Sequence, residues 1–412
     1  MFKRVSGTKD ILPEEISSWQ TIETIARRIF SLYNYQEMRT PLIEDASLFN
    51  RTLGETAEIV QKQMFLIHNQ EDTYALRPEG TAAIVRSYLE NNLDKEAGFT
   101  KLYYIGPMFR LERPQKGRLR QFHHIGCEAI GSAEASLDVE VISLAEQLLK
   151  NFGISGYKIK INSLGCLKDK AALNLSLKEK LQSKSKQLCD DCQQRLKNNV
   201  LRVLDCKNEA CQKIVKELSP GAEHLCPECL AHFAKVRNEL NNLNIVFEIA
   251  PQLVRGLDYY NRTVFEITHP DLGSQDAIGA GGRYAGLVKE LGGPDLEGIG
   301  FAFGIERLLL AKNSLSQKQQ KKLVYLITLG EVAKSVGLKI LNQLRDAGIP
   351  CDTDYLSKSL KAAMRAANDA GASTVLILGD DELKKNIIAV KNMSDSSQTE
   401  IPIENLTKEL KC

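Results

Sequence analysis

A helical segment interrupts a sequence that otherwise has the pattern of a strand-containing fold. From about Cys166 to Leu243 the chain is rich in Lys, Gln, Asn, Leu and Cys, its pattern is helical, and glycine is almost absent. The segments 254–267 and 277–304 that follow are aromatic, β-branched and rich in glycine, which is typical of strands and tight turns. We therefore expect one strand-containing domain with a helical insertion at residues 166–243.

The segment before the insertion predicts two long helices and several strands. Apolar residues recur at helical spacing from Ile16 to Tyr33 and from Ser136 to Phe152, and Gly153 fits the left-handed end of the second helix. Strands are expected at 35–41, 74–76 and 101–109, the last of them interrupted by Gly106-Pro107.

The C-terminal quarter of the chain predicts a second, smaller domain. A polar stretch at 311–322 has the composition of a linker, so the first domain with its linker spans residues 1–322. Beyond it, strands at 323–329, 350–355 and 374–378 alternate with helices at 331–346 and 357–370. This alternation is typical of a small parallel or mixed α/β domain at 323–412.

Length and composition argue against several classes of protein. The 412 residues suffice for two or three domains with sizeable cores, and 43% hydrophobic with 26% charged residues disfavours a fibrous or disordered chain. A net charge of +2 does not by itself indicate a nucleic-acid binder, so any polyanion site must come from local clustering. The sequence has no apolar run long enough to span a membrane and no signal-peptide pattern, so a cytoplasmic protein is expected.

One local cluster of basic residues lies between two strand-like stretches. The segment Arg110–Arg120 contains five cations and one anion, with Pro114 and Gly117 marking a loop. Because the arginine fork matches phosphate oxygens bidentately, Arg110 and the loop could hold a nucleotide phosphate and reach a nucleic-acid end. A solvated charged hairpin is the alternative.

Arg307 is a cation in an unusual place. It lies in the first turn of an apolar helical run that directly follows the strand-like Gly300–Phe303. A positive charge there opposes the helix dipole and needs an anionic partner, which a phosphate would supply. The alternatives are a pairing with Glu306 or a surface arginine whose stem packs on apolar residues.

Three further segments suit a small-molecule site. Gly279–Tyr284 predicts a glycine-rich turn close to a ligand, without the spacing of a Walker loop or of a dinucleotide fingerprint. Leu253–Arg262 places an arginine, an aspartate and two adjacent tyrosines beside a strand, and at least one tyrosine should be buried with a partner for its hydroxyl. Leu76–Thr81 has the pattern of a helix start, in which Glu79 and Thr81 either cap the helix or bind a ligand ammonium.

The order and spacing of these segments resemble the bacterial histidyl-tRNA synthetases, which are class II aminoacyl-tRNA synthetases. The resemblance covers essentially the whole chain. The most specific matches are Leu253–Arg262 and Gly279–Tyr284, which are similar to two signatures peculiar to the histidine enzymes. Residues 39–44 resemble motif 1, the dimer element, residues 109–122 with 126–128 resemble motif 2, and residues 300–307 resemble motif 3.

This resemblance implies a fold and an activity. The fold is an α+β catalytic domain with a mixed, mainly antiparallel sheet flanked by helices, followed by an anticodon-binding α/β domain at 323–412. The activity is the activation of L-histidine with ATP to histidyl-adenylate and its transfer to the 3′ end of the tRNA for histidine, with Mg²⁺ bridging the ATP phosphates. A homodimer is also implied, and the apolar face of the helix at Ile16–Tyr33 is taken to agree with it.

On the ATP side, the resemblance implies that Arg110 holds the α-phosphate and Arg307 the γ-phosphate. Glu112 and Arg118 would also contact ATP. Arg255 would stabilise the charge of the transition state in place of a side-chain base, so the implied catalytic residues are Arg255, Arg110 and Arg307. The loop implied to approach ATP and the tRNA acceptor end contains Arg113, Gln115, Lys116 and Arg118.

On the histidine side, the resemblance implies that Glu79 and Thr81 bind the α-ammonium group. Glu128 and Tyr260 would hydrogen-bond the two imidazole nitrogens, and a site built on those bonds rejects amino acids that lack them. The implied pocket also contains Arg255, Tyr259, Tyr284 and His124. The family usually has glutamine at the position of His124, and a histidine there could make substrate binding pH-dependent near neutrality.

Two related functions compete with this interpretation. A synthetase-like regulatory subunit of histidine biosynthesis keeps the fold but binds histidine only as a signal, and it typically lacks the anticodon domain. A tRNA-sensing module would keep that domain without needing Glu128 and Tyr260. The presence of Arg110, Arg255 and Arg307 favours the enzyme.

Six cysteines lie between Cys189 and Cys229, and such crowding in a cytosolic protein more often indicates a metal than disulfides. They are the C-x-x-C pairs Cys189, Cys192 and Cys226, Cys229, with Cys206 and Cys211 between them. One interpretation is a structural zinc held by the two pairs, with the two intervening cysteines as alternative ligands. The other is a set of thiols packed on helices. Packing is expected for Cys127, Cys166, Cys351 and Cys412.

Overall fold

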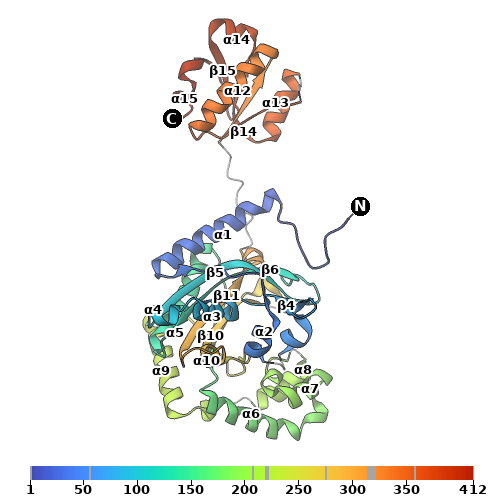
Figure 1. Cartoon of the computed structure of the whole chain (residues 1–412), viewed down its shortest axis with the longest axis vertical. Coiled ribbons are helices and arrows are strands. Elements are labelled where there is room, and N and C mark those ends of the chain that lie inside the picture. Colours follow the sequence, from blue (N-terminus) through green and yellow to red (C-terminus); the bar gives the residue numbers. More distant parts are fainter. Residues whose placement is uncertain are drawn as a thin grey trace. The chain divides into compact units, whose positions relative to one another are not determined.

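The computed structural model describes residues 2–54, 57–206, 208–218, 222–273, 276–312, 322–356 and 359–411. The chain divides into two compact units, residues 1–315 and 316–412 (Figure 1). Most of the segment expected to be a linker, 311–322, lies outside the described residues. Within the described ranges, no helix combines the length and the apolar character needed to cross a bilayer.

The first unit is built on an eight-stranded sheet of order β1-β5-β6-β11-β10-β9-β7-β8 (Figure 1). The strands from β5 to β7 in this order run antiparallel to their neighbours, whereas the edge strands β1 and β8 pair in parallel. Their bounds are β1 (Gln36–Glu37), β5 (Thr100–Phe109), β6 (Gln121–Ile130), β7 (Lys158–Ser163), β8 (Glu248–Ile249), β9 (Tyr260–Thr268), β10 (Ala277–Ala285) and β11 (Glu297–Gly304). The expected mixed, mainly antiparallel sheet is confirmed.

Helices α1 (Pro13–Leu32) and α5 (Ala135–Phe152) cover one face of this sheet. The apolar stripe of α1, which includes Trp19 and Ile22, shares a buried core with α5 and with Ile125 and Cys127 of β6. Both helices were expected, and α5 ends at a glycine with a φ of 74°. Because side chains alternate along a strand, His124 and Glu128 of β6 point to the opposite face of the sheet from Ile125 and Cys127.

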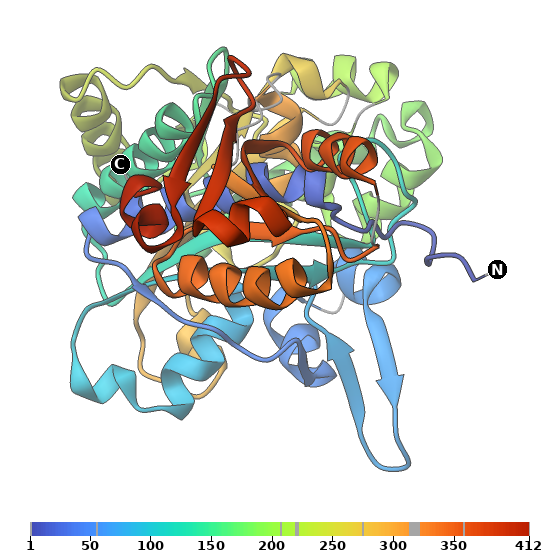
Figure 2. The same cartoon turned by 90° about the horizontal axis from the view of Figure 1, so that it is seen from above.

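Smaller elements surround that opposite face. A three-stranded sheet of order β2-β4-β3 carries a hairpin that Figure 2 shows projecting from the first unit. These elements are β2 (Ile43–Asp45), α2 (Ala46–Leu53), a π-helical turn (Ile59–Gln63), β3 (Phe65–His68), β4 (Thr73–Leu76), α3 (Thr81–Glu90), α4 (Leu93–Glu96) and α10 (Leu287–Glu290). Helix α11 (Ile305–Ala311) instead shares the buried core of α1 and α5.

The insertion is helical, and its core is continuous with that of the sheet. Its helices are α6 (Leu167–Gln182), α7 (Asp190–Asn198), α8 (Glu209–Glu217) and α9 (Pro227–Asn242), and Figure 1 shows α6, α7 and α8 grouped together. Leu173 and Leu177 of α6 belong to the same buried cluster as Tyr259, Tyr260 and Tyr284 of the sheet. Helix α9 packs instead against α5.

The second unit has a five-stranded sheet of order β13-β12-β14-β15-β16, in which the first three strands are parallel and the last two antiparallel. The expected mixed α/β fold is confirmed. Its elements are β12 (Leu323–Thr328), α12 (Glu331–Asp346), β13 (Cys351–Thr353), α13 (Leu360–Asp369), β14 (Ala372–Leu378), α14 (Asp380–Lys385), β15 (Ile387–Asn392), β16 (Gln398–Pro402) and α15 (Leu406–Glu409).

The structure corrects two expectations about strands. The expected strand at 35–41 is reduced to the two residues of β1, and β5 is continuous through Pro107. Pro107 fits because β1 pairs only with Leu102 and Tyr103, so that β5 is an edge strand beyond them.

The glycine-rich Gly279–Tyr284 is not the expected turn but part of β10. A Cβ at Gly281 would lie less than 3.0 Å from the carbonyl oxygen of Gly300, so glycine allows β10 and its neighbours to pack closely.

A fully buried ion pair fixes α5 to the sheet. Arg283 of β10 and Asp138 of α5 both have 0% exposed side chains, and the Arg283 guanidinium donates two hydrogen bonds to the Asp138 carboxylate, one of 3.1 Å from Nε. Arg283 also donates to the Glu297 carboxylate at 3.0 Å and to the carbonyl oxygens of Ser132 and Glu134. The arginine of the glycine-rich segment therefore has a structural role.

We predict that Asp138→Ala destabilises the first unit by about 3–5 kcal/mol, because it leaves the buried Arg283 without its closest counter-charge. The measurement is urea unfolding followed by the fluorescence of Trp19, which is the single tryptophan of the chain and is buried in this unit. Asp295→Ala is the matched control, since Asp295 pairs with Lys289 at the surface and should cost less than about 1 kcal/mol. Equal losses in the two variants would contradict the structural role of the buried pair.

Candidate active site

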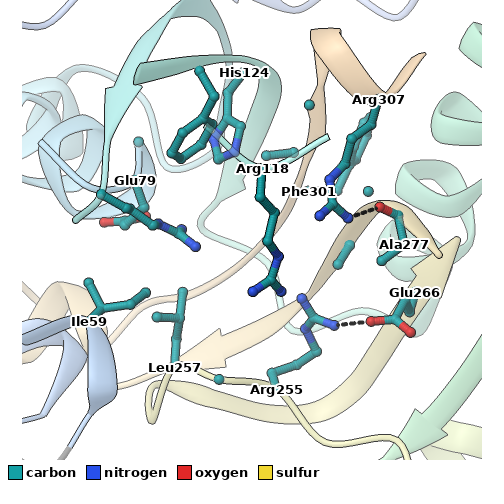
Figure 3. A pocket seen from close by; sticks show the side chains of 18 of the residues that line it. Ile59, Glu79, Arg118, His124, Arg255, Leu257, Glu266, Ala277, Phe301 and Arg307 are labelled. Atoms are coloured by element: carbon teal, nitrogen blue, oxygen red, sulfur yellow. Dashed lines mark hydrogen bonds and ion pairs between the residues drawn. The ribbon is translucent and has the colours of Figure 1, made fainter. Parts of the chain in front are cut away.

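A cavity of about 350 Å³ opens on the face of the sheet opposite α1 and α5. Its wall comes from β6, β10 and β11, the β5–β6 hairpin, the starts of α3 and α11, and the segment that precedes β9. Arginines gather here: Arg110, Arg118, Arg202, Arg255 and Arg307 line the cavity. Figure 3 shows Arg118, Arg255 and Arg307 extending toward the same part of it, with Glu79 on the other side.

Arg110 follows the end of β5 and is held without a full neutralising partner. Its Nε donates to the carbonyl oxygen of Pro78 at 2.9 Å, and its guanidinium lies over the ring of Phe122, 5.4 Å from the centroid. The nearest carboxylate, Glu112, is 3.8 Å away. Burial lowers the pKa of Arg110, but an arginine remains charged at any physiological pH.

The basic segment after Arg110 forms a hairpin closed by backbone pairing between Gln115 and Arg118. Arg118 lines the cavity and donates to Glu112 at 3.0 Å. The other residues implied to meet the tRNA end, Arg113, Gln115 and Lys116, are exposed on the hairpin. The hairpin thus combines one arginine that faces the cavity with a basic tip that faces solvent.

Arg307 projects into the cavity from the first turn of α11. Its Nε donates to the carbonyl oxygen of Gly117 at 3.0 Å, and its Nη1 donates to the carbonyl oxygen of Ala277. Burial and the charge of Arg118 lower its pKa. The alternative pairing with Glu306 is not formed, because the Glu306 carboxylate accepts the backbone N–H of His123 at 3.0 Å and lies 3.0 Å from His123 Nδ1.

Arg255 enters the cavity from the segment that precedes β9. Its Nη1 donates to Glu266 of β9 at 2.9 Å. Its Nε is buried and has no hydrogen-bond partner among the described residues. An unpaired buried donor is costly, so this position favours a bound acceptor.

At the other side of the cavity, Glu79 caps helix α3. Its carboxylate accepts the backbone N–H groups of Thr81 at 2.7 Å and Ala82 at 2.8 Å. Of the two alternatives for Glu79, the structure therefore contains the helix cap. Glu79 also lines the cavity, and its carboxylate has further lone pairs that can accept a hydrogen bond from a ligand.

Glu128 is the most deeply buried acid of the site. Its side chain lies in β6, is 1% exposed, and accepts hydrogen bonds from the Thr81 hydroxyl at 2.7 Å and the Tyr284 hydroxyl at 3.0 Å. Burial, together with the nearby charge of Glu79, raises the pKa of Glu128 to about 8. Glu128 itself is not among the residues that line the cavity, whereas its hydrogen-bond donor Thr81 lines it.

The implied tyrosines lie at two depths. Tyr259 and Tyr260 line the cavity, and their ring centroids are 4.6 Å apart. Tyr284 lies deeper, is 1% exposed, and donates a hydrogen bond from its hydroxyl to the Glu128 carboxylate. Burial raises the pKa of Tyr260 to about 12, so that its hydroxyl stays protonated and can donate.

His124 lies on the cavity wall, but it does not titrate near neutrality. Burial, with the charges of Arg110 and Arg77, lowers its pKa to about 3. The expected pH dependence from this histidine is therefore wrong, because the imidazole is neutral above about pH 4. Its buried Nδ1 has no partner in the part of the chain that the structure describes, which leaves a nitrogen for a ligand.

Sequence reasoning missed the contribution of the insertion to the cavity. Arg202 and Asp205, which follow α7, line it, and Arg202 lies 3.6 Å from the carboxylate of Glu58. They stand in a helical, polar segment whose pattern gives no sign of a cavity. Asn199 of the same segment donates to the Asp258 carboxylate at 2.9 Å.

The insertion cysteines do not combine as expected. The two C-x-x-C pairs belong to different clusters: Cys189 and Cys192 lie with Cys206 and Cys211, whereas Cys226 and Cys229 lie with Cys166 and Asp169. The single four-cysteine set built from both pairs is therefore wrong, and Cys166 is not merely a packed thiol. The reason is that each C-x-x-C starts a different helix, α7 or α9. Cys412 lies outside the described residues.

A histidyl-tRNA synthetase family model matches residues 7–308, and an anticodon binding domain model matches residues 323–412. The histidine–tRNA ligase of Halothermothrix orenii is 46% identical to this chain, covering 99% of it and 98% of the relative. The histidine–tRNA ligase of Clostridioides difficile is 43% identical, with 99% of each chain covered.

Solved structures agree with these matches. The crystal structure of apo S. aureus histidyl-tRNA synthetase is similar with a TM-score of 0.83 and 35% identity, and all of each chain is covered. A structure from Bacillus halodurans described as an ATP phosphoribosyltransferase regulatory subunit/histidyl-tRNA synthetase has a TM-score of 0.67 and 24% identity, covering 92% of this chain and 98% of that one. The latter likeness concerns the fold alone. The family model and the full-length relatives together place this chain in the histidyl-tRNA synthetase family.

Proposed function

We propose that this chain is a histidine–tRNA ligase, which joins L-histidine to the 3′ end of its tRNA at the expense of ATP and releases AMP and pyrophosphate. The observation that carries the proposal is that one cavity brings several arginines together with a buried carboxyl network. Arg118, Arg255 and Arg307 extend into one part of it (Figure 3), and Glu79, linked through Thr81 to Glu128, lies on the other side near Arg110, which is anchored on Pro78. Such a cavity suits a triphosphate beside an amino acid.

The arginines of the cavity suit the phosphates of ATP. Arg110 would bind the α-phosphate and Arg307 the γ-phosphate, with Arg118 and Glu112 completing the site. Support comes from the way the guanidiniums of Arg110 and Arg307 are anchored. The hydrogen bonds described above for both guanidiniums go to carbonyl oxygens, which orient an arginine side chain without carrying a net charge.

The carboxyl network suits histidine. Glu79 and Thr81 would bind the α-ammonium, and Glu128 would accept the N–H of one imidazole nitrogen. Tyr260 would donate its hydroxyl to the other nitrogen, and Tyr259, Tyr284 and His124 would complete the pocket. An amino acid without two ring nitrogens would leave Glu128 and Tyr260 unpaired in a buried place, which a site of this kind rejects strongly.

The first step of the proposed reaction needs no side-chain base. An oxygen of the histidine carboxylate, already ionised at neutral pH, attacks the α-phosphorus of ATP. The new O–P bond forms as the bond to pyrophosphate breaks, and pyrophosphate leaves. The free Nε of Arg255 is a donor suited to the charge that develops on the reacting oxygens. In the second step a 3′-terminal hydroxyl of tRNA attacks the histidyl carbonyl, and AMP leaves.

Mg²⁺ belongs to this proposal as the counter-ion of ATP. It prefers hard oxygen ligands, and the cavity wall includes the carboxylates of Glu112 and Asp276 as well as the phosphates it would receive. When bound, the ion would neutralise phosphate charge and orient the phosphates.

The tRNA contacts are proposed for two places. The exposed basic hairpin tip with Arg113, Gln115 and Lys116 would meet the acceptor end, and residues 323–412 would read the anticodon. Because charged tRNA is used by ribosomes, the proposed enzyme acts in the cytoplasm.

A homodimer is also proposed, on a different surface from the one first expected. The apolar face of α1 packs in the chain's own core and is not available to a partner. Exposed apolar side chains instead lie on one face of the small sheet and just before it: Ile43 of β2 and Ile67 of β3 are 51% and 42% exposed, and Leu42, which precedes β2, is 41% exposed. Such a patch is typical of a covered interface.

The test of the function is histidine-dependent ATP–pyrophosphate exchange without tRNA. We expect exchange in the native chain and a loss of about 10²–10³-fold in Arg255→Ala, the usual effect of removing one donor to a developing oxyanion. Arg28→Ala is the matched control, because Arg28 is an exposed arginine of α1, and it should retain full exchange. Tight histidine binding by calorimetry with no exchange in the native chain would instead identify a histidine sensor.

A second prediction concerns pH. With a pKa of about 8, Glu128 is mostly protonated at pH 7 and must lose its proton to accept the imidazole N–H. Histidine affinity should therefore rise by about eightfold between pH 7 and pH 8.5, since the ionised fraction rises by that factor. Calorimetric titrations should give a nearly flat profile for Glu128→Gln. His124→Gln should keep the native profile because His124 is neutral throughout, so a flattened His124→Gln profile would reassign the titration.

A further inference from the structure

The insertion contains two four-residue clusters of metal-ligand side chains. In the first, the thiols of Cys189, Cys192, Cys206 and Cys211 have all their sulfur atoms within 4.8 Å of one another. In the second, the thiols of Cys166, Cys226 and Cys229 and a carboxylate oxygen of Asp169 are equally close. We call these the four-cysteine cluster and the mixed cluster.

Each cluster is assembled by two helix N-termini. Cys189 is the N-cap of α7 and Cys192 lies three residues later, while Cys211 lies three residues after Asn208, the N-cap of α8. The mixed cluster repeats this design. Cys226 is the N-cap of α9 with Cys229 three residues later, and Cys166 is the N-cap of α6 with Asp169 three residues later. The spacing is the C-x-x-C type found at zinc sites, with an aspartate in one of the four places.

The distances fit a shared ion better than disulfides. Cys189 Sγ and Cys206 Sγ are 3.8 Å apart, whereas a disulfide requires about 2.05 Å. Four ligands around one Zn²⁺ with Zn–S bonds of about 2.3 Å form a tetrahedron whose edges are about 3.8 Å. Disulfides would also pair sulfurs two by two, whereas in each cluster all four ligand atoms converge.

Backbone donors surround the sulfur atoms, as they do around thiolates. The N–H of Cys189 points to Cys211 Sγ at 3.3 Å, and the N–H of Asn208 points to Cys206 Sγ at 3.4 Å. In the mixed cluster the N–H of Cys166 lies 3.2 Å from Cys229 Sγ and 3.3 Å from the Asp169 carboxylate. Such hydrogen bonds, with the positive ends of the helices, stabilise the negative charge of metal-bound ligands.

We propose that the insertion binds two structural Zn²⁺ ions, one in the four-cysteine cluster and one in the mixed cluster. Zinc is the divalent ion that suits thiolate-rich, tetrahedral sets. The short helices of the insertion would also be stabilised by bound ions. Helices α7 and α8 have nine residues each, a length that is marginal in isolation, and the buried side chains of α7 are only Cys192 and Leu196. Metal binding would provide the folding free energy that their small core lacks.

The mixed cluster also connects to the proposed histidine pocket. Lys170, one residue after Asp169 in α6, donates to the carbonyl oxygens of Asp258 at 2.5 Å and Tyr260 at 3.1 Å. The ion would thus fix the start of the helix that holds the segment carrying Tyr259 and Tyr260. This consequence rests on the proposed function, whereas the metal sites themselves do not.

The experiment is elemental analysis of the full chain, expressed in zinc-supplemented medium and purified without chelator. We expect two zinc ions per chain in the native protein, one in Cys189→Ser, one in Cys226→Ser and two in Cys351→Ser. Serine is a good N-cap, so the two cluster variants should keep their helices. Cys351 lies in the second unit and is the control. Stoichiometric iron, no metal, or a single zinc lost only from one cluster variant would each overturn the two-site inference.

Two further measurements do not depend on the variants folding. A mercurial added to the native chain should release two equivalents of zinc to a chromogenic indicator, and mass spectrometry should find no disulfide within the insertion. A disulfide within either cluster would overturn its assignment.

A prediction on activity links the mixed cluster to the proposed histidine pocket: Cys226→Ser should raise the KM for histidine severalfold in the exchange assay. Two zinc ions in a chain without exchange activity would reject the proposed function and leave the metal sites standing.

Discussion

The carboxyl group of Glu128 is the constraint around which the site is built. It is buried in the central sheet, where an acid is tolerated only if its oxygens are satisfied. Thr81 from α3 and Tyr284 from β10 satisfy them, so one side chain ties a helix start and two strands together. Space for it exists because β11 has a glycine beside it: a Cβ at Gly300 would lie less than 3.0 Å from the Glu128 carboxylate. The hydrogen-bond capacity that remains on Glu128 is what a ligand can use.

The arginines of the cavity pose the reverse problem, because cations must be positioned by groups that carry no net charge. Arg110 and Arg307 are positioned by the carbonyl oxygens of Pro78, Gly117 and Ala277. A carbonyl oxygen fixes the direction of a guanidinium but carries no net charge. Arg255 differs, because Glu266 neutralises part of its charge while its Nε remains free. This division agrees with two arginines that bind phosphate and a third that acts at the reacting atoms.

Much of this arrangement could be predicted from the sequence, and the failures have physical reasons. The long helices follow from periodicity, and the placement of Arg110, Arg255 and Arg307 around one site follows from the resemblance to the histidyl-tRNA synthetases. The structural role of Arg283 could not be predicted, because its partner Asp138 is 145 residues away and no local sequence pattern pairs the two. The predicted turn at Gly279–Tyr284 is wrong because glycine in a sequence signals either a turn or a close approach of two backbones, and here it allows the close approach. The edge strand β16 is largely exposed and polar, so it lacks the alternation that marks a half-buried strand.

The role of the insertion could not be predicted from its sequence pattern, because it depends on contacts with distant parts of the chain. Its leucines share a core with Tyr259, Tyr260 and Tyr284, and Arg202 reaches the cavity wall. Helices α7 and α8 have only nine residues each, and the proposed ions would fix where they start. The ligand pairs stand at those starts, at α6, α7, α8 and α9, and the first of these helices carries Lys170 onto the backbone beside Tyr260. The position of α6 in the insertion is therefore coupled, through Lys170, to the position of the tyrosines that line the cavity.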